Sequence, residues 1–222
     1  MNDSVPIDRW PAPASARLVA LMGGSFDPVH LGHVELGLAA RDAMQAPWLV
    51  FMPAARNPLK PIGPMLDDRL RIELLALALN STPGTAISTL ELESPEGEPS
   101  YTIDTLRQLL VLAPETRVRL VIGADSARSF HRWRDPQGII AIAEPVVVLR
   151  SPDDTADRLI ETMSPFWPRA DLDRWRNRII RTPLVDASST EIRGLLEARA
   201  WDDPRLRAAL APAVLDRLRA RG

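Results

Sequence analysis

The sequence predicts a single α/β domain built on a doubly wound, mostly parallel β-sheet. Short apolar runs, each long enough for one buried strand, recur at 18–22, 48–52, 118–122 and 145–149. The segments between them have helical spacing, and parallel strands need such helical connections. A glycine-rich turn at 23–33 joins the first run to a helix, as expected where an open α/β sheet binds a ligand.

Composition limits the classes of function. The chain has 222 residues, of which 45% are hydrophobic, enough for one large core. The net charge of −2 gives no basic face for nucleic acid. There is no cysteine, which excludes disulfides and thiolate metal sites. No apolar run approaches the ~20 residues of a membrane span. We expect neither a nucleic-acid nor a membrane partner, and the sequence leaves the oligomeric state open.

The N-terminal segment, residues 1–16, does not resemble a signal peptide. It carries Asp3, Asp8, Arg9 and three prolines, and it has no apolar stretch. We therefore expect residues 1–16 to form a flexible tail, residues 17–222 to form the domain, and the protein to be cytoplasmic.

The stretch with the clearest chemistry is the turn that follows the first apolar run. Gly23 and Gly24 allow backbone angles closed to other residues and a close approach of a ligand to the main chain. The next segment reads as a helix, whose free N–H groups and positive end attract anions. His30 and His33 are three positions apart and thus share one face at the helix start. Together these features predict a phosphate site.

Residues 23–33 read Gly-Gly-Ser-Phe-Asp-Pro-Val-His-Leu-Gly-His. All eleven positions resemble the signature of the nucleotidyltransferases that share a His-x-Gly-His motif. The resemblance implies a Rossmann-like nucleotidyltransferase fold, with catalytic roles for His30 and His33. It also implies ATP binding by Gly23, Gly24, Ser25, Phe26, His30, Gly32 and His33.

A proline-rich segment follows the second apolar run. Its sequence Asn57-Pro58-Leu59-Lys60 resembles a Pro-Pro-His-Lys-type motif of nicotinate mononucleotide adenylyltransferases. The second proline and the lysine are kept, whereas Leu59 stands where that family has histidine. The resemblance implies that Lys60 is a mobile phosphate ligand with a catalytic role.

The alternating run 85–92 predicts a strand, and a helix opens near Thr102. Ser100-Tyr101-Thr102-Ile103-Asp104-Thr105-Leu106 resembles the second motif of the same family. The resemblance implies that Thr102 and the neighbouring amides face the nicotinate end of the substrate, with Asp104 mainly structural. The alternative is that Thr102 and Asp104 only cap the helix.

Asp125 stands in a Gly-x-Asp sequence at the end of the third apolar run, and Trp133 follows eight positions later. This resembles the third family motif, which implies that Asp125 contacts the ribose region and Trp133 lies against the pyridine ring. A flat aromatic side chain offers a stacking face, and Arg134 with Arg132 would favour a carboxylate on that ring. The alternatives are that Trp133 packs with residues 139–140 and that the arginines are simply solvated.

The last motif begins at Ser188, which with Glu191 fits a capping box and predicts a helix start. The alternative is a cap and nothing more. Ala187 to Arg193 resembles the Ile-Ser-Ser-Thr-x-Ile-Arg signature of the superfamily, with Ala187 in place of isoleucine. The resemblance implies a second ATP-binding group made of Ser188, Ser189, Thr190 and Arg193.

Together the motifs between residues 23 and 193 resemble those of nicotinate mononucleotide adenylyltransferase. The implied reaction transfers adenylyl from ATP to nicotinate mononucleotide, giving nicotinate adenine dinucleotide and pyrophosphate for NAD biosynthesis. The implied cofactor is Mg²⁺, bound mainly through the ATP phosphates, with no metal site of the protein's own. The attacking phosphate is already mostly dianionic near neutral pH, so no catalytic base is required.

Three other interpretations fit parts of the sequence. Another transferase of the superfamily would use nicotinamide mononucleotide or pantetheine phosphate as acceptor. A class I aminoacyl-tRNA synthetase also carries a similar His-x-Gly-His motif, but 222 residues leave no room for tRNA-binding domains. A non-catalytic nucleotide sensor would keep the fold without the reaction.

Overall fold

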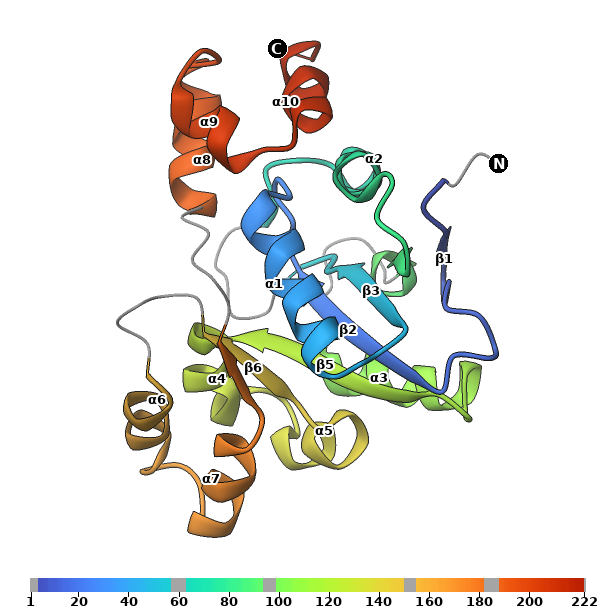
Figure 1. Ribbon diagram of the computed structural model, residues 1–222, viewed down its shortest axis with the longest axis vertical. Helices are drawn as coiled ribbons and strands as arrows, with labels where there is room; N and C mark the ends of the chain where they lie inside the picture. The colour runs from blue at the N-terminus through green and yellow to red at the C-terminus, as the bar shows by residue number, and fades with distance from the viewer. Residues whose placement is uncertain (1–3, 57–62, 94–98, 150–154, 182–187, 222) are drawn as a thin grey trace.

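A computed structural model describes residues 4–56, 63–93, 99–149, 155–181 and 188–221. Its centre is a seven-stranded sheet in the order β1-β4-β3-β2-β5-β6-β7, in which every pairing is parallel. Helices cover both faces of this sheet (Figure 1). The predicted doubly wound α/β fold is confirmed.

The strands are β1 (Ile7–Asp8), β2 (Leu18–Gly24), β3 (Trp48–Pro53), β4 (Thr85–Ser88), β5 (Arg117–Gly123), β6 (Val146–Leu149) and β7 (Ile179–Arg181). The α-helices are α1 (Leu31–Ala43), α2 (Asp68–Leu79), α3 (Thr102–Leu112), α4 (Ala124–Ser129), α5 (Pro136–Ala143), α6 (Ala156–Met163), α7 (Arg169–Arg176), α8 (Ser189–Glu197), α9 (Pro204–Ala209) and α10 (Pro212–Arg219). Short 3-10 helices span Leu90–Glu93 and Phe130–Arg132.

Each central strand contributes alternate side chains to two hydrophobic cores, one on each face of the sheet. In β2, Val19 and Leu21 pack on the face covered by α3 to α7. Ala20 and Met22 pack on the opposite face, which α1, α2 and α8 to α10 cover. Burial on both faces explains why this strand reads as a continuous apolar run rather than as an alternating one.

The N-terminal segment differs from the expected flexible tail. Ile7 and Asp8 form the edge strand β1, which pairs in parallel with Ile87 and Ser88 of β4. Ala12 and Ala16 further along the segment are buried. The expectation of a tail is therefore wrong for residues 7–16. Two paired residues are too few to leave a periodic pattern in the sequence, which is why β1 was not predicted.

The strand expected at 85–92 ends early, at Ser88. The Ser88 hydroxyl donates to the Arg9 carbonyl at 2.5 Å, and the Leu90 N–H donates to the same Ser88 oxygen at 3.3 Å. The chain then forms the 3-10 helix Leu90–Glu93 instead of continuing the sheet. A side chain that binds nearby backbone groups competes with the ladder, and periodicity alone does not reveal this.

The helix start predicted at Ser188 is confirmed, because Ser188 caps α8 by accepting from the Glu191 N–H. The carboxylate of Asp67 caps α2 in the same way, by accepting from the Leu70 N–H at 2.9 Å. Trp167 and Trp175 are buried. Among the helices that the structure describes, none combines the length and the apolar character needed to cross a bilayer.

The chain winds outward in opposite directions from the centre of the sheet. Strands β2, β3 and β4 follow one another toward one edge, whereas β5, β6 and β7 run toward the other. The reversal places a topological switch point between β2 and β5. In open α/β sheets, ligands bind outside the carboxyl ends of the strands at such a point.

Candidate active site

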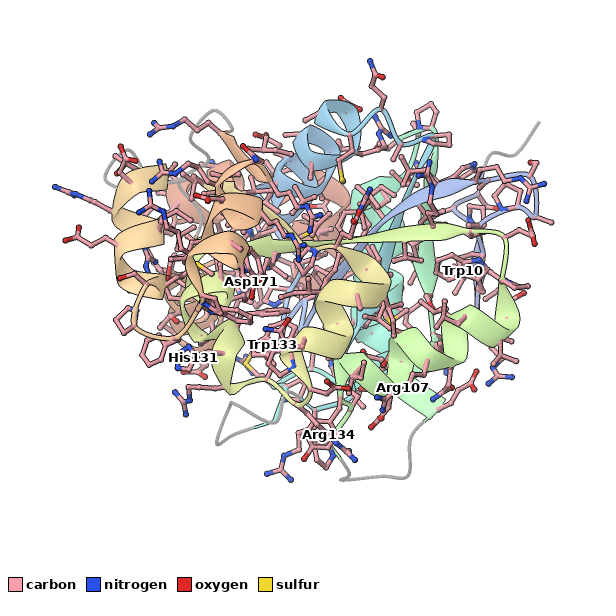
Figure 2. All side chains as sticks on the ribbon, turned by 90° about the horizontal axis from the view of Figure 1, so that it is seen from below. Trp10, Arg107, His131, Trp133, Arg134 and Asp171 are labelled. Atoms are coloured by element: carbon pink, nitrogen blue, oxygen red, sulfur yellow. The ribbon has the colours of Figure 1, made fainter. Side chains whose placement is uncertain are left out.

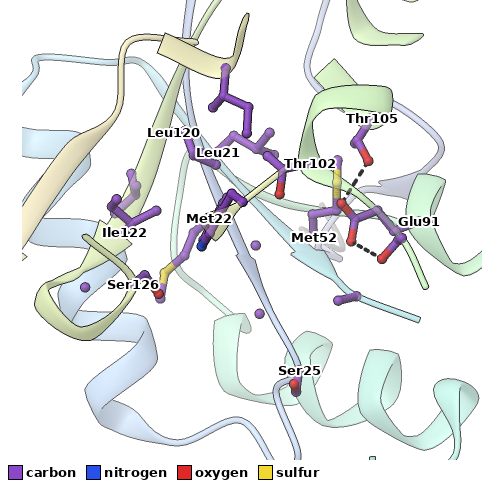
Figure 3. A pocket seen from close by; sticks show the side chains of 18 of the residues that line it. Leu21, Met22, Ser25, Met52, Glu91, Thr102, Thr105, Leu120, Ile122 and Ser126 are labelled. Atoms are coloured by element: carbon purple, nitrogen blue, oxygen red, sulfur yellow. Dashed lines mark hydrogen bonds between the residues drawn. The ribbon is translucent and has the colours of Figure 1, made fainter. Parts of the chain in front are cut away.

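A pocket of about 530 Å³ opens at this switch point. Pairing between β2 and β5 runs from Leu18–Arg117 to Leu21–Leu120, whereas β2 stays paired with β3 as far as Gly24–Pro53. The walls of the pocket come from the turn after β2, the start of α3 and the turn from β5 into α4 (Figure 3). These three segments therefore meet at one edge of the sheet.

The glycine-rich turn is tightly constrained around Phe26. This residue has a φ of 44°, in the left-handed region that costs a non-glycine residue about 1–3 kcal/mol. Burial of its ring offsets the cost, since it packs edge-on against His33 and Phe51 with centroids 5.2 and 5.6 Å apart. A Cβ on Gly24 would lie 3.0 Å from this buried ring, so the position favours glycine.

Asp27 holds the same turn from the side of the segment before α2. Its buried carboxylate accepts from the backbone N–H groups of Met65 and Leu66 at 2.7 and 2.9 Å. Two such bonds fix the carboxylate in place, and Asp27 thereby ties the turn to the chain that enters α2. We did not single out Asp27 from the sequence, although it lies within the signature.

The two histidines lie together, as their spacing predicts, but in different surroundings. Their rings stack with centroids 3.7 Å apart. His33 lines the pocket, and its Nδ1 accepts from the His30 backbone N–H at 3.4 Å. In the neutral ring the proton of His33 then lies on Nε2. His30 is only 2% exposed, and its Nε2 lies 3.0 Å from the Ser189 hydroxyl.

The start of α8 meets the glycine-rich turn. Besides the contact between His30 and Ser189, the Arg193 guanidinium donates to the Asp27 carbonyl at 3.2 Å and to the Thr190 hydroxyl at 3.3 Å. The two expected ATP-binding groups are thus brought into contact. Of these two groups, within the described part of the chain, the first contributes residues to the pocket lining and α8 contributes none.

Two of the expected positions, Lys60 and Ala187, lie outside the described residues. Gly23, Gly24 and Ser25 all line the pocket, and a Cβ on Gly23 would meet only open space. Gly32 is buried in the first turn of α1.

The opposite wall of the pocket holds Thr102, the first residue of α3. Tyr101 is the N-cap residue of α3, and its side chain forms no capping hydrogen bond with the first N–H groups of the helix. Asp104 has a structural partner, because its carboxylate accepts from Arg134 at 3.0 Å. The Arg134 guanidinium also lies 4.8 Å from the centroid of the Tyr101 ring, which holds it at the rim of the pocket.

Trp133 and Asp125 also line the pocket. The Trp133 ring packs against Phe130 with centroids 4.9 Å apart, so it belongs both to the core and to the pocket wall. Its Nε1 is buried without a hydrogen-bond partner in the described chain. Figure 2 shows Trp133 lying inward and Arg134 at the edge of the molecule. The Asp125 carboxylate accepts from Arg128 at 2.8 Å.

A buried carboxyl, that of Glu91, forms part of the pocket wall and was missed from the sequence. Its oxygens accept from the hydroxyls of Ser100 and Thr105, each at 2.9 Å (Figure 3). Burial is the largest influence and raises the pKa of Glu91, while the two hydroxyls oppose the rise. The alternating pattern around Glu91 did not indicate a buried carboxyl, because such a pattern assigns a residue to one face of a strand but does not identify the side chains that contact it.

Comparison with known proteins agrees with this geometry. Residues 21–195 match the family model described as Cytidylyltransferase-like. A protein of Rhodopirellula baltica named "Probable nicotinate-nucleotide adenylyltransferase" is 35% identical over 82% of this chain and 83% of that protein. One of the same name from Stenotrophomonas maltophilia is 34% identical over 90% of this chain and 93% of its own.

Among solved structures, the nicotinic acid mononucleotide adenylyltransferase of Plasmodium falciparum, complexed with APC, has a TM-score of 0.65. It covers 92% of this chain and 96% of its own, at 17% identity, which supports the fold alone. The same enzyme complexed with NaAD has a TM-score of 0.63. The family model and the two relatives place the chain plainly: it belongs to the cytidylyltransferase-like family, among relatives named as nicotinate-nucleotide adenylyltransferases.

Proposed function

We propose that the protein transfers the adenylyl group of ATP to nicotinate mononucleotide, giving nicotinate adenine dinucleotide and pyrophosphate in NAD biosynthesis. The observation that carries the proposal is the pocket at the switch point. One of its walls is the His-x-Gly-His turn, and the other is the start of α3 with Trp133. A nucleotide and a second, aromatic substrate would meet between those walls. The names of the relatives support the same reaction.

In the reaction, a phosphate oxygen of nicotinate mononucleotide attacks the α-phosphorus of ATP. The new P–O bond forms as the bond to the pyrophosphate oxygen breaks, and pyrophosphate leaves with that electron pair. No proton has to be removed from the dianionic nucleophile. Catalysis therefore rests on alignment and on neutralising charge at the α-phosphate and the leaving group.

The first wall is suited to that task. The Nε2–H of His33 would donate to the triphosphate near the reacting phosphorus, where the glycine-rich turn lets the ligand approach the main chain. His30 would support this donor through the stacked ring pair. Lys60, Ser188, Ser189, Thr190 and Arg193 are proposed to hold the β- and γ-phosphate oxygens, the α8 residues acting from the opposite side of the turn.

The second wall is suited to the acceptor. Trp133 would stack on the pyridine ring, and Asp125 would accept from the ribose hydroxyls. The positive N-terminal end of α3, beginning at Thr102, and the guanidinium of Arg134 would attract the ring carboxylate. This positive character favours nicotinate over nicotinamide, which carries no charge at that position.

Magnesium fits this site as a partner of the nucleotide. The side chains at the turn are imidazoles, hydroxyls and a guanidinium, which suit phosphate oxygens, whereas Mg²⁺ prefers oxygen ligands and keeps several waters. Within the described residues, no cluster of three metal-binding side chains is present. When bound, the ion would be held mainly by ATP and water and would neutralise phosphate charge.

Localisation in the cytoplasm stays a prediction.

The test is product identification. The purified protein is incubated with ATP, magnesium and nicotinate mononucleotide, and the products are separated and identified by mass spectrometry. We expect nicotinate adenine dinucleotide and pyrophosphate in equal amounts. Binding of ATP without turnover of any acceptor would instead support a nucleotide sensor. Turnover with pantetheine phosphate but not with nicotinate mononucleotide would refute the proposed acceptor.

A further inference from the structure

Behind the glycine-rich turn lies a fully buried guanidinium that neither the sequence motifs nor the proposed reaction uses. Arg71 is in the first turns of α2, and its side chain is 0% exposed. Its Nη1 donates to the Ser25 carbonyl at 2.6 Å, and its Nη2 donates to the Asp68 carboxylate at 2.6 Å. Ser25 lines the pocket, whereas Arg71 does not. The side chain therefore reaches the site only through the backbone of the turn.

Stability alone does not account for this residue. Burying a charged group is costly, and an ion pair that is replaced by well-packed apolar side chains often leaves a protein as stable or more so. Among the described residues, Arg71 pairs with the carboxylate of Asp68, whose side chain is 51% exposed. The Nε of Arg71 is buried without a partner in the described chain. An apolar side chain at this position would avoid these costs but would leave the Ser25 carbonyl without its donor.

The contact with Ser25 fixes the direction of one peptide group. In a planar trans peptide, the C=O and the following N–H point in opposite directions. Because the Ser25 carbonyl points to Arg71 in α2, the Phe26 N–H points away from α2. The turn is already strained at Phe26, where φ is 44°, and such a conformation persists only where neighbouring contacts impose it. Arg71 is one of these contacts.

We propose that Arg71 is a positioning residue for ATP, which keeps the Ser25 carbonyl turned away from the phosphates and the Phe26 N–H available to them. A carbonyl that faced the pocket would present a negative dipole to the triphosphate. The inference rests on the proposed function in one respect: ATP is taken to bind at this turn. It predicts that loss of Arg71 weakens the binding of ATP and spares that of nicotinate mononucleotide, which would occupy the other wall.

The test compares Arg71→Met, Arg71→Lys and Asp68→Asn with the unchanged protein. Arg217→Met is the matched control, because Arg217 also pairs with an acid of α2, Glu73, at 2.6 Å, but forms no hydrogen bond with the turn within the described residues. Calorimetry gives the dissociation constants of ATP with magnesium and of nicotinate mononucleotide, and thermal unfolding shows that each variant is folded.

We expect Arg71→Met to weaken ATP binding about tenfold or more, the scale for a hydrogen bond from a charged donor. Arg71→Lys should lose less, because one ammonium can still reach the carbonyl. Asp68→Asn should lose about two- to threefold, since an amide oxygen without negative charge then holds the guanidinium less tightly. Nicotinate mononucleotide binding should change less than about twofold in all three, and the control should change neither constant.

Unchanged ATP binding in a folded Arg71→Met protein would overturn the inference, as would an equal loss for both substrates. If Arg71→Met does not fold, Arg71→Lys and Asp68→Asn decide by the same comparison. An unchanged protein that binds no ATP would refute the proposed function, and this inference with it. If the unchanged protein binds ATP and a folded variant binds it equally well, only the role of Arg71 is refuted.

Discussion

The Nε2 of His30 lies 3.0 Å from the hydroxyl of Ser189, a contact between residues 159 positions apart in the sequence. It joins the turn after β2 to the first residue of α8, and the bond from Arg193 to the Asp27 carbonyl reinforces the junction. Each nucleotide-binding signature thus supports the other. The proposed phosphate site would therefore depend on the packing of α8 against the turn as much as on the motifs themselves.

This junction predicts energetic coupling between His30 and Ser189. We expect His30→Ala and Ser189→Ala to be non-additive in the free energy of unfolding and in kcat/KM, with a coupling energy of about 0.5–1.5 kcal/mol. The measurement is a double-mutant cycle by urea unfolding and steady-state kinetics. His30→Ala combined with Thr155→Ala, which removes the cap of α6, is the control and should be additive. Additivity in the first pair would show that the contact contributes nothing.

His33 is predicted to be the donor nearest the chemistry. His33→Ala should fold normally and lose at least about 10²-fold in kcat, since a preorganised donor to the reacting group is removed. His131→Ala is the matched control, because its ring stacks on Phe166 and does not line the pocket. Steady-state assays of pyrophosphate release check both variants. Near-normal turnover of His33→Ala would remove the proposed role.

Trp133 is predicted to act on the acceptor substrate. Losing a stacked aromatic face costs about 1–3 kcal/mol, so Trp133→Ala should raise the KM for nicotinate mononucleotide about five- to hundredfold. Trp133→Phe should raise it less, and the KM for ATP should stay unchanged in both. Trp10→Phe alters a tryptophan that packs on the same core away from the pocket, and should change neither KM. Equal changes in both KM values would assign Trp133 to packing alone.

Glu91 predicts a pH dependence of stability. Because burial raises the pKa of Glu91, the folded protein holds its proton more tightly than the unfolded chain does. Its contribution to stability is therefore present at low pH and is lost as the pH rises above the ordinary glutamate value of 4.5. Glu91→Gln removes this titration, so its melting temperature minus that of the unchanged protein should increase with pH. Thermal melts from about pH 4 to about pH 8 test this, and a constant difference would contradict it.

The sequence predicted those parts of the molecule that depend on local pattern. Strands β2 and β5 are buried on both faces, so they appear as apolar runs, and the turn after β2 carries its chemistry in consecutive residues. The cap at Ser188 is equally local. These predictions rest on neighbours within a few positions, where side-chain type and backbone conformation are directly linked.

The parts that the sequence did not predict depend on partners that are distant or weakly patterned. Arg71 looks like a solvated helical arginine until the Ser25 carbonyl is found beside it. Glu91 looks like the polar face of a strand until Ser100 and Thr105 are found to surround it. Sequence spacing also placed His30 and His33 on one face, but only packing against Ser189 distinguishes their surroundings.

The central claim is that the pocket joins ATP to a pyridine nucleotide that carries a ring carboxylate. The most direct test measures pyrophosphate release from ATP and magnesium, with nicotinate mononucleotide and nicotinamide mononucleotide in parallel. We predict a higher kcat/KM for the acid, by about tenfold or more, because the start of α3 and Arg134 present positive charge to the ring. Equal values would contradict the carboxylate site, and no release with either substrate would contradict the reaction itself.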